Sequence, residues 1–250
     1  MSETESREVG TVLVISRDSV ASGEIGDVLK HHALRVEMSV DTSTASDRIS
    51  RQKFEAIVVD LAIGERVNGF LRQIRESASN RTAVAFAITS DSDETRHALK
   101  QGFSFALERP LSPESIGHTL KVAYGLIVRE RRRYFRYPVV VPVVLNRKAE
   151  SEVYGRSVNV SECGMALSTS TALAPGLEGT VQFTLPDLAQ ITAESRVCWN
   201  NAKGEAGLLF LFMPMNIASE LQAWLAGKLE EQLPQTVADR FRRTEGEFSQ

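Results

Sequence analysis

The first half of the chain alternates short apolar runs with longer segments in which apolar residues recur every three or four positions. A short apolar run is typical of a buried strand, and the longer spacing is typical of one face of a helix. We predict strands at 12–15, 34–38, 56–59, 83–88 and 103–107. We predict helices at 20–31, 44–52, 69–76, 93–101 and 113–128. Such alternation builds a parallel sheet with helices on its faces, so this half is expected to be an α/β domain of flavodoxin-like (βα)5 architecture.

The second half has further short apolar runs and ends in a helical pattern. Strand-like segments include 195–199 and 207–212. They are followed by apolar residues at the spacing of a helix that packs on a neighbouring surface: Ile217, Leu221, Trp224, Leu225 and Leu229. Pro234 would end this helix, and the polar residues 234–250 are expected to form a mobile tail.

Composition narrows the classes of function. The chain has 250 residues and a net charge of −3, which suits two domains and disfavours non-specific nucleic-acid binding. Because the sequence lacks a Gly-x-Ser-x-Gly elbow, a phosphate-binding loop and zinc-ligand spacing, we expect no enzyme activity, no metal and no cofactor. The polar start of the chain and the absence of a long apolar run lead us to expect a cytoplasmic protein without a membrane span.

Two polar segments carry side chains suited to binding a guanine nucleotide. The first is an arginine cluster ahead of a strand-like run, with Arg131, Arg132 and Arg136. Guanidinium groups grip phosphate and the guanine edge in bidentate geometry and stack on flat rings. The second segment is Asn159-Val160-Ser161-Glu162-Cys163-Gly164. Its amide can meet a guanine edge, its hydroxyl can meet a phosphate, and its glycine lets a ligand approach the backbone.

Each segment alone also has a simpler interpretation. An arginine run is often a solvated linker or the basic end of a helix, and Asn-x-Ser-x-x-Gly is often a plain turn. Together, in this order and spacing, the two segments resemble the RxxxR and [D/N]xSxxG motifs of the PilZ domain. The resemblance runs from Glu130 to the helix after Pro214. It implies a six-stranded antiparallel β-barrel with a carboxy-terminal helix, and a site for cyclic di-GMP formed by Arg131, Arg132, Arg136, Asn159, Ser161 and Gly164.

The first half resembles the receiver domain of bacterial response regulators, with departures at its phosphorylation site. Asp60 lies at the position of the family's phosphoacceptor, and Thr89 lies at that of its hydroxyl residue. Ser16-Arg17 replaces the family's acidic pair, and Arg109 replaces its lysine. Phosphorylation requires Mg²⁺, which needs the missing carboxylates and would be repelled by Arg17. Two roles for Asp60 stay open, namely a structural ion pair with Arg17 and a strand-end residue left from ancestry.

We therefore predict a pseudo-receiver domain at 9–127, a basic hinge at 128–137, a PilZ-like barrel with its helix at 138–233, and the tail. The expected function is that of a signalling adaptor in which cyclic di-GMP orders the hinge and reorients the domains. A protein partner is expected to bind through the receiver-like domain, and no DNA or RNA is expected to bind. The alternatives are a ligand-independent interaction module and a phosphorylatable response regulator with a PilZ output domain.

Overall fold

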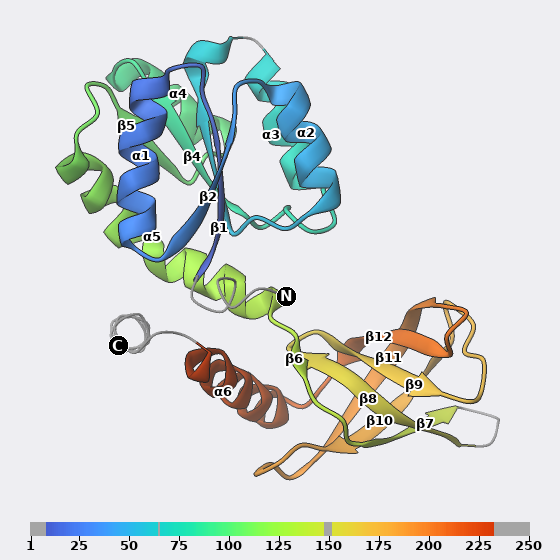
Figure 1. Cartoon of the computed structure of the whole chain (residues 1–250). Coiled ribbons are helices and arrows are strands. Elements are labelled where there is room, and N and C mark those ends of the chain that lie inside the picture. The colour runs from blue at the N-terminus through green and yellow to red at the C-terminus, as the bar shows by residue number, and fades with distance from the viewer. Residues whose placement is uncertain (1–8, 65, 148–151, 233–250) are drawn as a thin grey trace. The chain divides into compact units, whose positions relative to one another are not determined.

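A computed structural model of the chain describes residues 9–64, 66–147 and 152–232 (Figure 1). The chain divides into two compact units between Arg131 and Arg132. We call residues 9–131 the amino-terminal domain and residues 132–231 the barrel domain. The mobile tail predicted at 234–250 lies outside the described residues.

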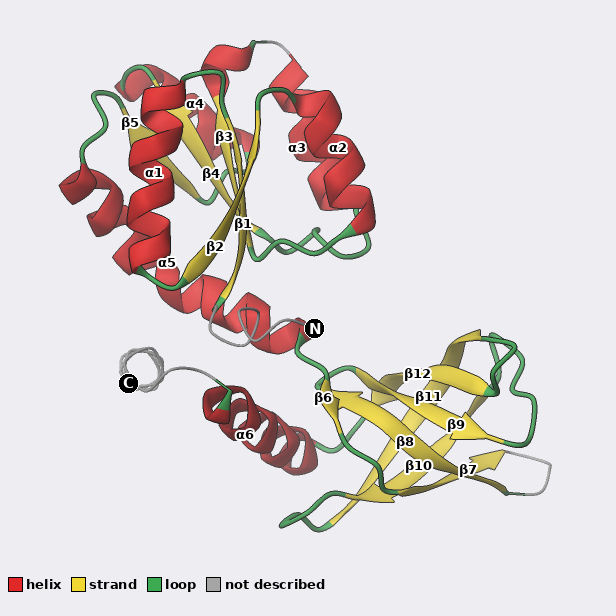
Figure 2. Ribbon diagram, in the orientation of Figure 1, coloured by secondary structure: helices red, strands yellow, loops and turns green. Residues whose placement is uncertain are grey.

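The amino-terminal domain is built on a parallel sheet in the order β2-β1-β3-β4-β5. Its strands are β1 (Gly10–Ile15), β2 (Leu34–Ser39), β3 (Ala56–Asp60), β4 (Val84–Thr89) and β5 (Phe105–Glu108). Its helices are α1 (Ser19–His31), α2 (Thr42–Arg51), α3 (Arg66–Glu76), α4 (Ser92–Gln101) and α5 (Pro113–Tyr134), with a short 3-10 turn at Leu61–Ile63. Helices cover both faces of the sheet, with α1 on one side and α2 and α3 on the other (Figure 2). The flavodoxin-like fold expected from the sequence is therefore confirmed.

The core of this domain explains why its strands were recognisable in the sequence. All residues of β3 and β4 are buried, which is typical of central strands in a parallel sheet. Side chains from α2, α3 and α4, including Ile49, Phe70 and Ala98, pack against one face of the sheet. Burial on both faces requires continuous apolar runs, and those runs are the pattern that predicts the strands.

Helix α5 is longer than the sequence pattern predicts. The predicted helix ends at residue 128, whereas α5 continues through Tyr134, and so the predicted hinge at 128–137 is helical over most of its length. Arginine and glutamate are good helix formers, and no glycine or proline interrupts the chain between Val128 and Pro138. Apolar periodicity alone could not reveal this extension, because the added turns carry mostly charged residues.

The barrel domain is a closed antiparallel barrel. Its strands are β7 (Pro142–Arg147), β8 (Val153–Ser161), β9 (Gly164–Thr169), β10 (Glu178–Thr184), β11 (Gln190–Asn200) and β12 (Glu205–Phe212). The sheet runs β8-β7-β10-β11-β12-β9, and it closes because β8 also pairs with β9. The short strand β6 (Tyr137–Pro138) pairs with β8 beyond the end of β7. The six-stranded barrel implied by the sequence is therefore confirmed.

Helix α6 (Met215–Glu231) follows the last strand and packs on the barrel domain. It buries Leu221, Leu225 and Leu229, a stripe at the spacing of one helix face. Trp224 meets Tyr137 of β6 edge to face, with ring centroids 5.3 Å apart. Among the described residues, no helix combines the length and the hydropathy needed to cross a membrane.

Candidate functional site

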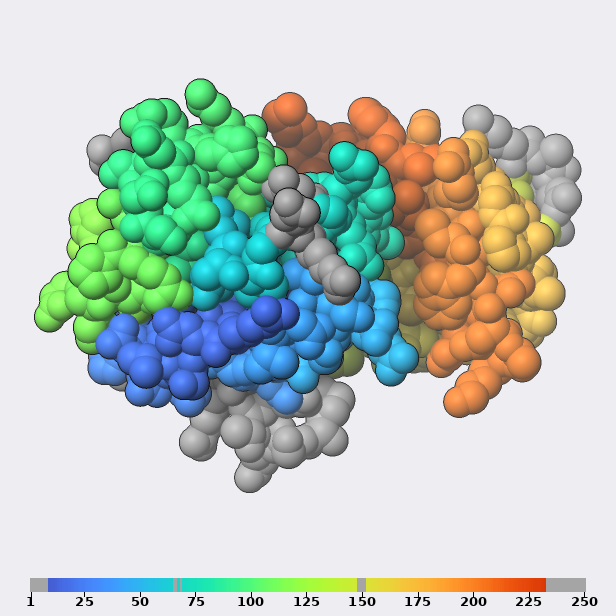
Figure 3. Space-filling view, turned by 90° about the horizontal axis from the view of Figure 1, so that it is seen from above, coloured from blue at the N-terminus to red at the C-terminus, as the bar shows by residue number. Residues whose placement is uncertain are grey.

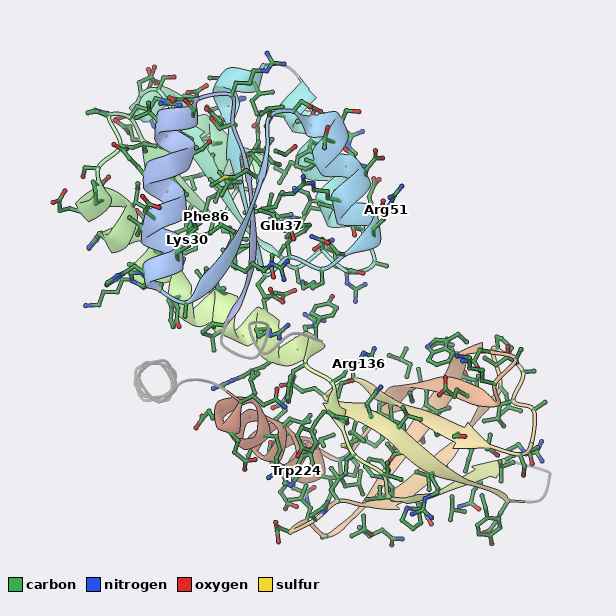
Figure 4. All side chains as sticks on the ribbon, viewed as in Figure 1. Lys30, Glu37, Arg51, Phe86, Arg136 and Trp224 are labelled. Atoms are coloured by element: carbon green, nitrogen blue, oxygen red, sulfur yellow. The ribbon has the colours of Figure 1, made fainter. Side chains whose placement is uncertain are left out.

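Strand β6 brings the two polar segments of the barrel domain together. Tyr137 lies opposite Val160, and Pro138 lies opposite Asn159. In this antiparallel register the preceding residue, Arg136, falls beside Ser161. Because side chains alternate between the faces of a sheet, and Val160 is fully buried in the core, Arg136 and Asn159 share the outer face. The structure thus places the arginine segment alongside the Asn-x-Ser segment. Figure 4 labels Arg136 where the chain passes from α5 into β6.

Asn159 has an unsatisfied polar atom on this face. Its side-chain oxygen, Oδ1, is buried and has no hydrogen-bond partner within the described residues. A buried acceptor without a partner costs about 1–3 kcal/mol, so native structures rarely keep one without a reason. A ligand that donates a hydrogen bond to Oδ1 would remove this cost.

Trp199 is a candidate site residue that the sequence motifs did not indicate. Asn159, Ala166, Gly207 and Trp199 form one row across four neighbouring strands, so their side chains face the same way. The indole lies over Gly207, where a Cβ atom would come within 2.1 Å of its Nε1. Trp199 is 44% exposed, and because its indole lies over Gly207, the aromatic surface is about two strand spacings, roughly 10 Å, from Asn159. Only the strand register reveals this arrangement, because forty residues separate the two in the chain.

Ser161 and Gly164 shape the turn between β8 and β9. The Ser161 hydroxyl is buried and donates to the carbonyl oxygen of Gly164 at 3.0 Å. A Cβ on Gly164 would lie 2.1 Å from the carbonyl oxygen of Leu208 in β12, so the adjacent strand already requires glycine here. The sequence suggested a phosphate contact for the hydroxyl and a ligand approach over the glycine. Both residues have structural partners in this turn, and their contact with a ligand stays a prediction.

The arginines of the first segment have different surroundings. Phe135 is buried in the barrel domain, and the next residue, Arg136, is exposed, as an extended chain requires. Arg132 is half-buried on the last turn of α5. Arg131 instead contacts the amino-terminal domain, where its Nη1 lies 3.9 Å from Oε1 of the buried Glu55.

The site around Asp60 lies at the carboxyl edge of the parallel sheet, which Figure 3 views from above. Asp60 ends β3 and is 2% exposed. Its Oδ2 accepts a hydrogen bond from Ser16 Oγ at 2.5 Å. The same oxygen forms an ion pair with Arg109 Nη2 at 2.9 Å. The other nitrogen of the fork, Nη1, lies 2.8 Å from Asp18 Oδ2. One guanidinium therefore bridges both carboxylates of the site.

The protonation of these groups follows from the bridge. The pKa of Asp18 is lowered. The main cause is the hydrogen bond that its carboxylate accepts from the backbone N–H of Ala21 at the start of α1, and the second is the hydrogen bond from Arg109. Burial acts to lower the pKa of Arg109, but Asp18 and Asp60 outweigh it, and the pKa is raised overall. The charged form of Arg109 is thus the stable one, and the site carries a permanent cation.

Arg17 does not have the role that the sequence suggested as one of two possibilities. The ion pair to Asp60 comes from Arg109. Arg17 is exposed, and its positive charge is one of the causes that lower the pKa of Asp41. Thr89 ends β4, and its hydroxyl lies 2.7 Å from that of Thr95. The residues of this site do not fit Mg²⁺, because a guanidinium already lies between the two carboxylates that would bind it.

The barrel domain matches a known family. The model of the PilZ domain family matches residues 130–227. A search of curated proteins found no match. Both motif segments, from Arg131 to Gly164, lie within the matched range.

Solved structures similar to the chain include response regulators. The chemotaxis response regulator CheY4 of Vibrio cholerae is 17% identical, with a TM-score of 0.42, over 45% of this chain and 96% of that one. The receiver domain of a sensor histidine kinase from Pseudomonas aeruginosa is 21% identical, with a TM-score of 0.40, over 45% and 95%. The Inhibitor of motility of Bacillus subtilis is 20% identical, with a TM-score of 0.34, over 39% and 50%.

The fold of the amino-terminal domain is established by its strand order, which is the doubly wound order found in receivers. The identity of the barrel domain is established by the family match and by a barrel that holds both motifs. The chain therefore carries a PilZ domain at residues 130–227, joined to an amino-terminal domain with the fold of response-regulator receivers.

Proposed function

We propose that the barrel domain binds cyclic di-GMP on its outer face, with Arg132, Arg136 and Asn159 as ligand contacts. The observation that carries this proposal is the unsatisfied Oδ1 of Asn159, on the same face as the exposed Arg136. Cyclic di-GMP combines two planar guanines with two phosphates. An amide acceptor matches the guanine edge, guanidinium groups match the phosphates, and an aromatic surface matches the guanine face.

Each contact has a definite chemical role. The N1–H and N2–H groups of guanine are donors, and Asn159 Oδ1 is the acceptor that they would satisfy. Arg136 and Arg132 would bind phosphate oxygens or the O6/N7 edge of guanine through bidentate hydrogen bonds. Trp199 would stack on a guanine ring, because its indole lies over Gly207 on the same face. Ser161 and Gly164 would hold the turn that presents Asn159.

The amino-terminal domain is proposed to act without phosphorylation. Arg109 pairs with Asp60 and with Asp18, so each carboxylate has a cationic partner without a metal ion or a phosphoryl group. A domain held in one electrostatic state is suited to constant contact with a protein partner. This supports an adaptor in which ligand sensing belongs to the barrel domain.

Ligand binding is further proposed to order the segment between the domains and to change their orientation. Arg132 begins the barrel domain, and Arg136 lies two residues after the end of α5, so the ligand contacts and the domain connection share one segment. Hydrogen-exchange mass spectrometry tests this step. Amides at 132–137, in the last turn of α5 and the residues after it, should become more protected when cyclic di-GMP binds, because helix ends fray, while those at 127–131 should already be protected. Equal protection of 132–137 with and without ligand would contradict the ordering step.

Calorimetric titration with cyclic di-GMP tests the binding proposal itself. Arg136→Ala should remove a charge-assisted contact of about 1.5–3 kcal/mol and weaken binding at least tenfold. Arg136→Lys should not restore it, because lysine cannot form the bidentate contact. Arg133→Ala is the matched control, because Arg133 is also exposed and carries the same charge.

Two results would reject the proposal. One is the absence of both heat and a fluorescence change from Trp199 at high ligand concentration. The other is an equal loss of affinity in the Arg133 and Arg136 variants, which would indicate attraction by net charge alone. Either result favours the alternative of a ligand-independent interaction module.

A further inference from the structure

Arg131 and Arg132 are neighbours in the arginine segment, yet they belong to different compact units. Helix α5 turns about 100° per residue, so adjacent side chains cannot face the same partner. Ile127, Glu130 and Arg131 share one face, at the spacing i, i+3 and i+4. Ile127 and Glu130 are buried in the amino-terminal domain, at 0% and 6% exposure. Arg132 is rotated away from that face.

Glu55 is the partner of Arg131 and lies in a closely fitted position just before β3. Its carboxylate is 2% exposed, and its Oε2 accepts the backbone N–H of Thr11 at 2.6 Å. Gly10 makes room for it, since a Cβ there would come within 2.9 Å of Oε2. The other oxygen, Oε1, faces Arg131 Nη1 at 3.9 Å. The position is thus built to hold the carboxyl group of Glu55, with the guanidinium of Arg131 facing it.

A second acid–base contact joins the same turn of α5 to the sheet. The buried Glu130 forms an ion pair with Lys53, two residues before Glu55. The hydroxyl of Thr82 donates to the same Glu130 oxygen at 2.5 Å. Two successive residues of α5 therefore contact the chain just ahead of β3 and β4. We call Lys53, Glu55, Thr82, Glu130 and Arg131 the helix anchor.

Burial makes the two acidic groups of the helix anchor, Glu55 and Glu130, dependent on their partners. Burial raises the pKa of Glu55, and the Thr11 N–H and then the charge of Arg131 oppose that rise. Removing one partner of a buried pair leaves an uncompensated charge and is strongly destabilising. The anchor therefore stabilises only the arrangement in which Arg131 faces Glu55.

We propose that Arg131 is a positioning residue of the amino-terminal domain and not a ligand contact. Its pairing with Glu55 holds the end of α5 so that Arg132 is the first arginine presented to the ligand. This inference rests on the proposed binding of cyclic di-GMP for its effect on affinity, but the anchor itself is independent of any ligand. It revises the site implied by the sequence, in which both arginines bind the nucleotide.

Two adjacent substitutions in the full chain separate the roles. Hydrogen exchange of peptides that cover 10–15 and 53–60 reports on the anchor, and calorimetric titration with cyclic di-GMP reports on the site. Arg131→Ala should raise exchange in both peptides and weaken binding less than fivefold. Arg132→Ala should leave that exchange unchanged and weaken binding more than tenfold. Arg131→Lys should restore protection, since a charge near Glu55 suffices there.

A double substitution tests whether Glu55 is the partner that matters. In a Glu55→Gln background the buried carboxylate is gone, so Arg131→Ala should add little further exchange. Glu55→Gln keeps the acceptor for Thr11 N–H and is therefore expected to fold. An undiminished effect of Arg131→Ala in that background would overturn the pairing.

The two readouts also separate failure of this inference from failure of the proposed function. If the wild-type chain binds no cyclic di-GMP, the function fails, but the exchange pattern still tests the anchor. If Arg131→Ala abolishes binding and leaves exchange at 10–15 and 53–60 unchanged, Arg131 is a ligand contact. That result would reject the positioning role while supporting the proposed function.

Discussion

The two polar sites of this chain differ in whether their charges are satisfied from within. In the amino-terminal domain, Ser16, Asp18 and Asp60 all contact one another or Arg109 at 2.5–3.0 Å. In the barrel domain, Asn159 Oδ1 is buried without a partner among the described residues, and Arg136 and Trp199 are exposed on the same face. A site whose groups satisfy one another gives a ligand little to gain. A site with an unsatisfied acceptor rewards a ligand that supplies the missing hydrogen bond.

The largest expected effect follows from removing Arg109 from the Asp60 site of the amino-terminal domain. Arg109→Ala leaves the buried Asp60 without its cation and should lower the stability of the amino-terminal domain by about 2–3 kcal/mol, somewhat below the cost for a fully buried pair because Arg109 is partly exposed. Urea denaturation measures this loss. Arg17→Ala is the control and should change stability by less than about 0.5 kcal/mol. Equal losses in both variants would contradict the bridge by Arg109.

The second prediction concerns the Asn159 site of the barrel domain, where a substitution should lower ligand affinity without lowering stability. Asn159→Ala removes an unsatisfied acceptor, so the free barrel domain should not lose stability. The same change should weaken cyclic di-GMP binding by about 1–2 kcal/mol, or five- to thirtyfold. Denaturation and titration of the same preparation give both values. A loss of stability without a loss of affinity would mean that Asn159 is structural, as the simple turn interpretation holds.

The third prediction uses pH to probe a buried carboxyl away from both sites. The pKa of Glu55 in the folded chain is raised above its ordinary value of 4.5, mainly by burial. The folded state therefore holds this proton more tightly, and the associated stability is complete below pH 4.5 and is lost as pH rises through the folded pKa. Glu55→Gln should remove that loss. Its urea midpoint, relative to wild type, should rise with pH, and a constant difference would refute the assignment.

The last prediction is that the amino-terminal domain takes up no phosphoryl group. Incubation with acetyl phosphate and Mg²⁺ should leave the intact mass of the chain unchanged, because Arg109 lies between the carboxylates that would bind the metal. A phosphorylatable receiver in the same mixture is the positive control. A gain of one phosphoryl group that disappears in Asp60→Asn would show that Arg109 can leave the two carboxylates. It would support the alternative of a phosphorylatable response regulator.

Local pattern alone was sufficient for the architecture of the amino-terminal domain, whereas the barrel was implied by the resemblance that the two motifs carry. Continuous apolar runs in β3 and β4 follow from burial on both sides of a parallel sheet, and they are visible without any contact information. The arginine and Asn-x-Ser segments were recognisable because their residue types and spacing are specific. The end of α5 was not recognisable, because charged residues carry no apolar period.

Partners across the sheet and across the domain were decided only by the tertiary structure. Asp60 could have paired with Arg17, its near neighbour at the sheet edge, yet the chain brings Arg109 to it from the end of β5. Trp199 reaches the row of Asn159 only through the register of four strands. Arg131 and Arg132 look equivalent in sequence, but helix rotation gives one to Glu55 and turns the other away. Sequence sets which groups are available, whereas long-range register and helical phase determine which of them meet, because both depend on contacts between distant residues.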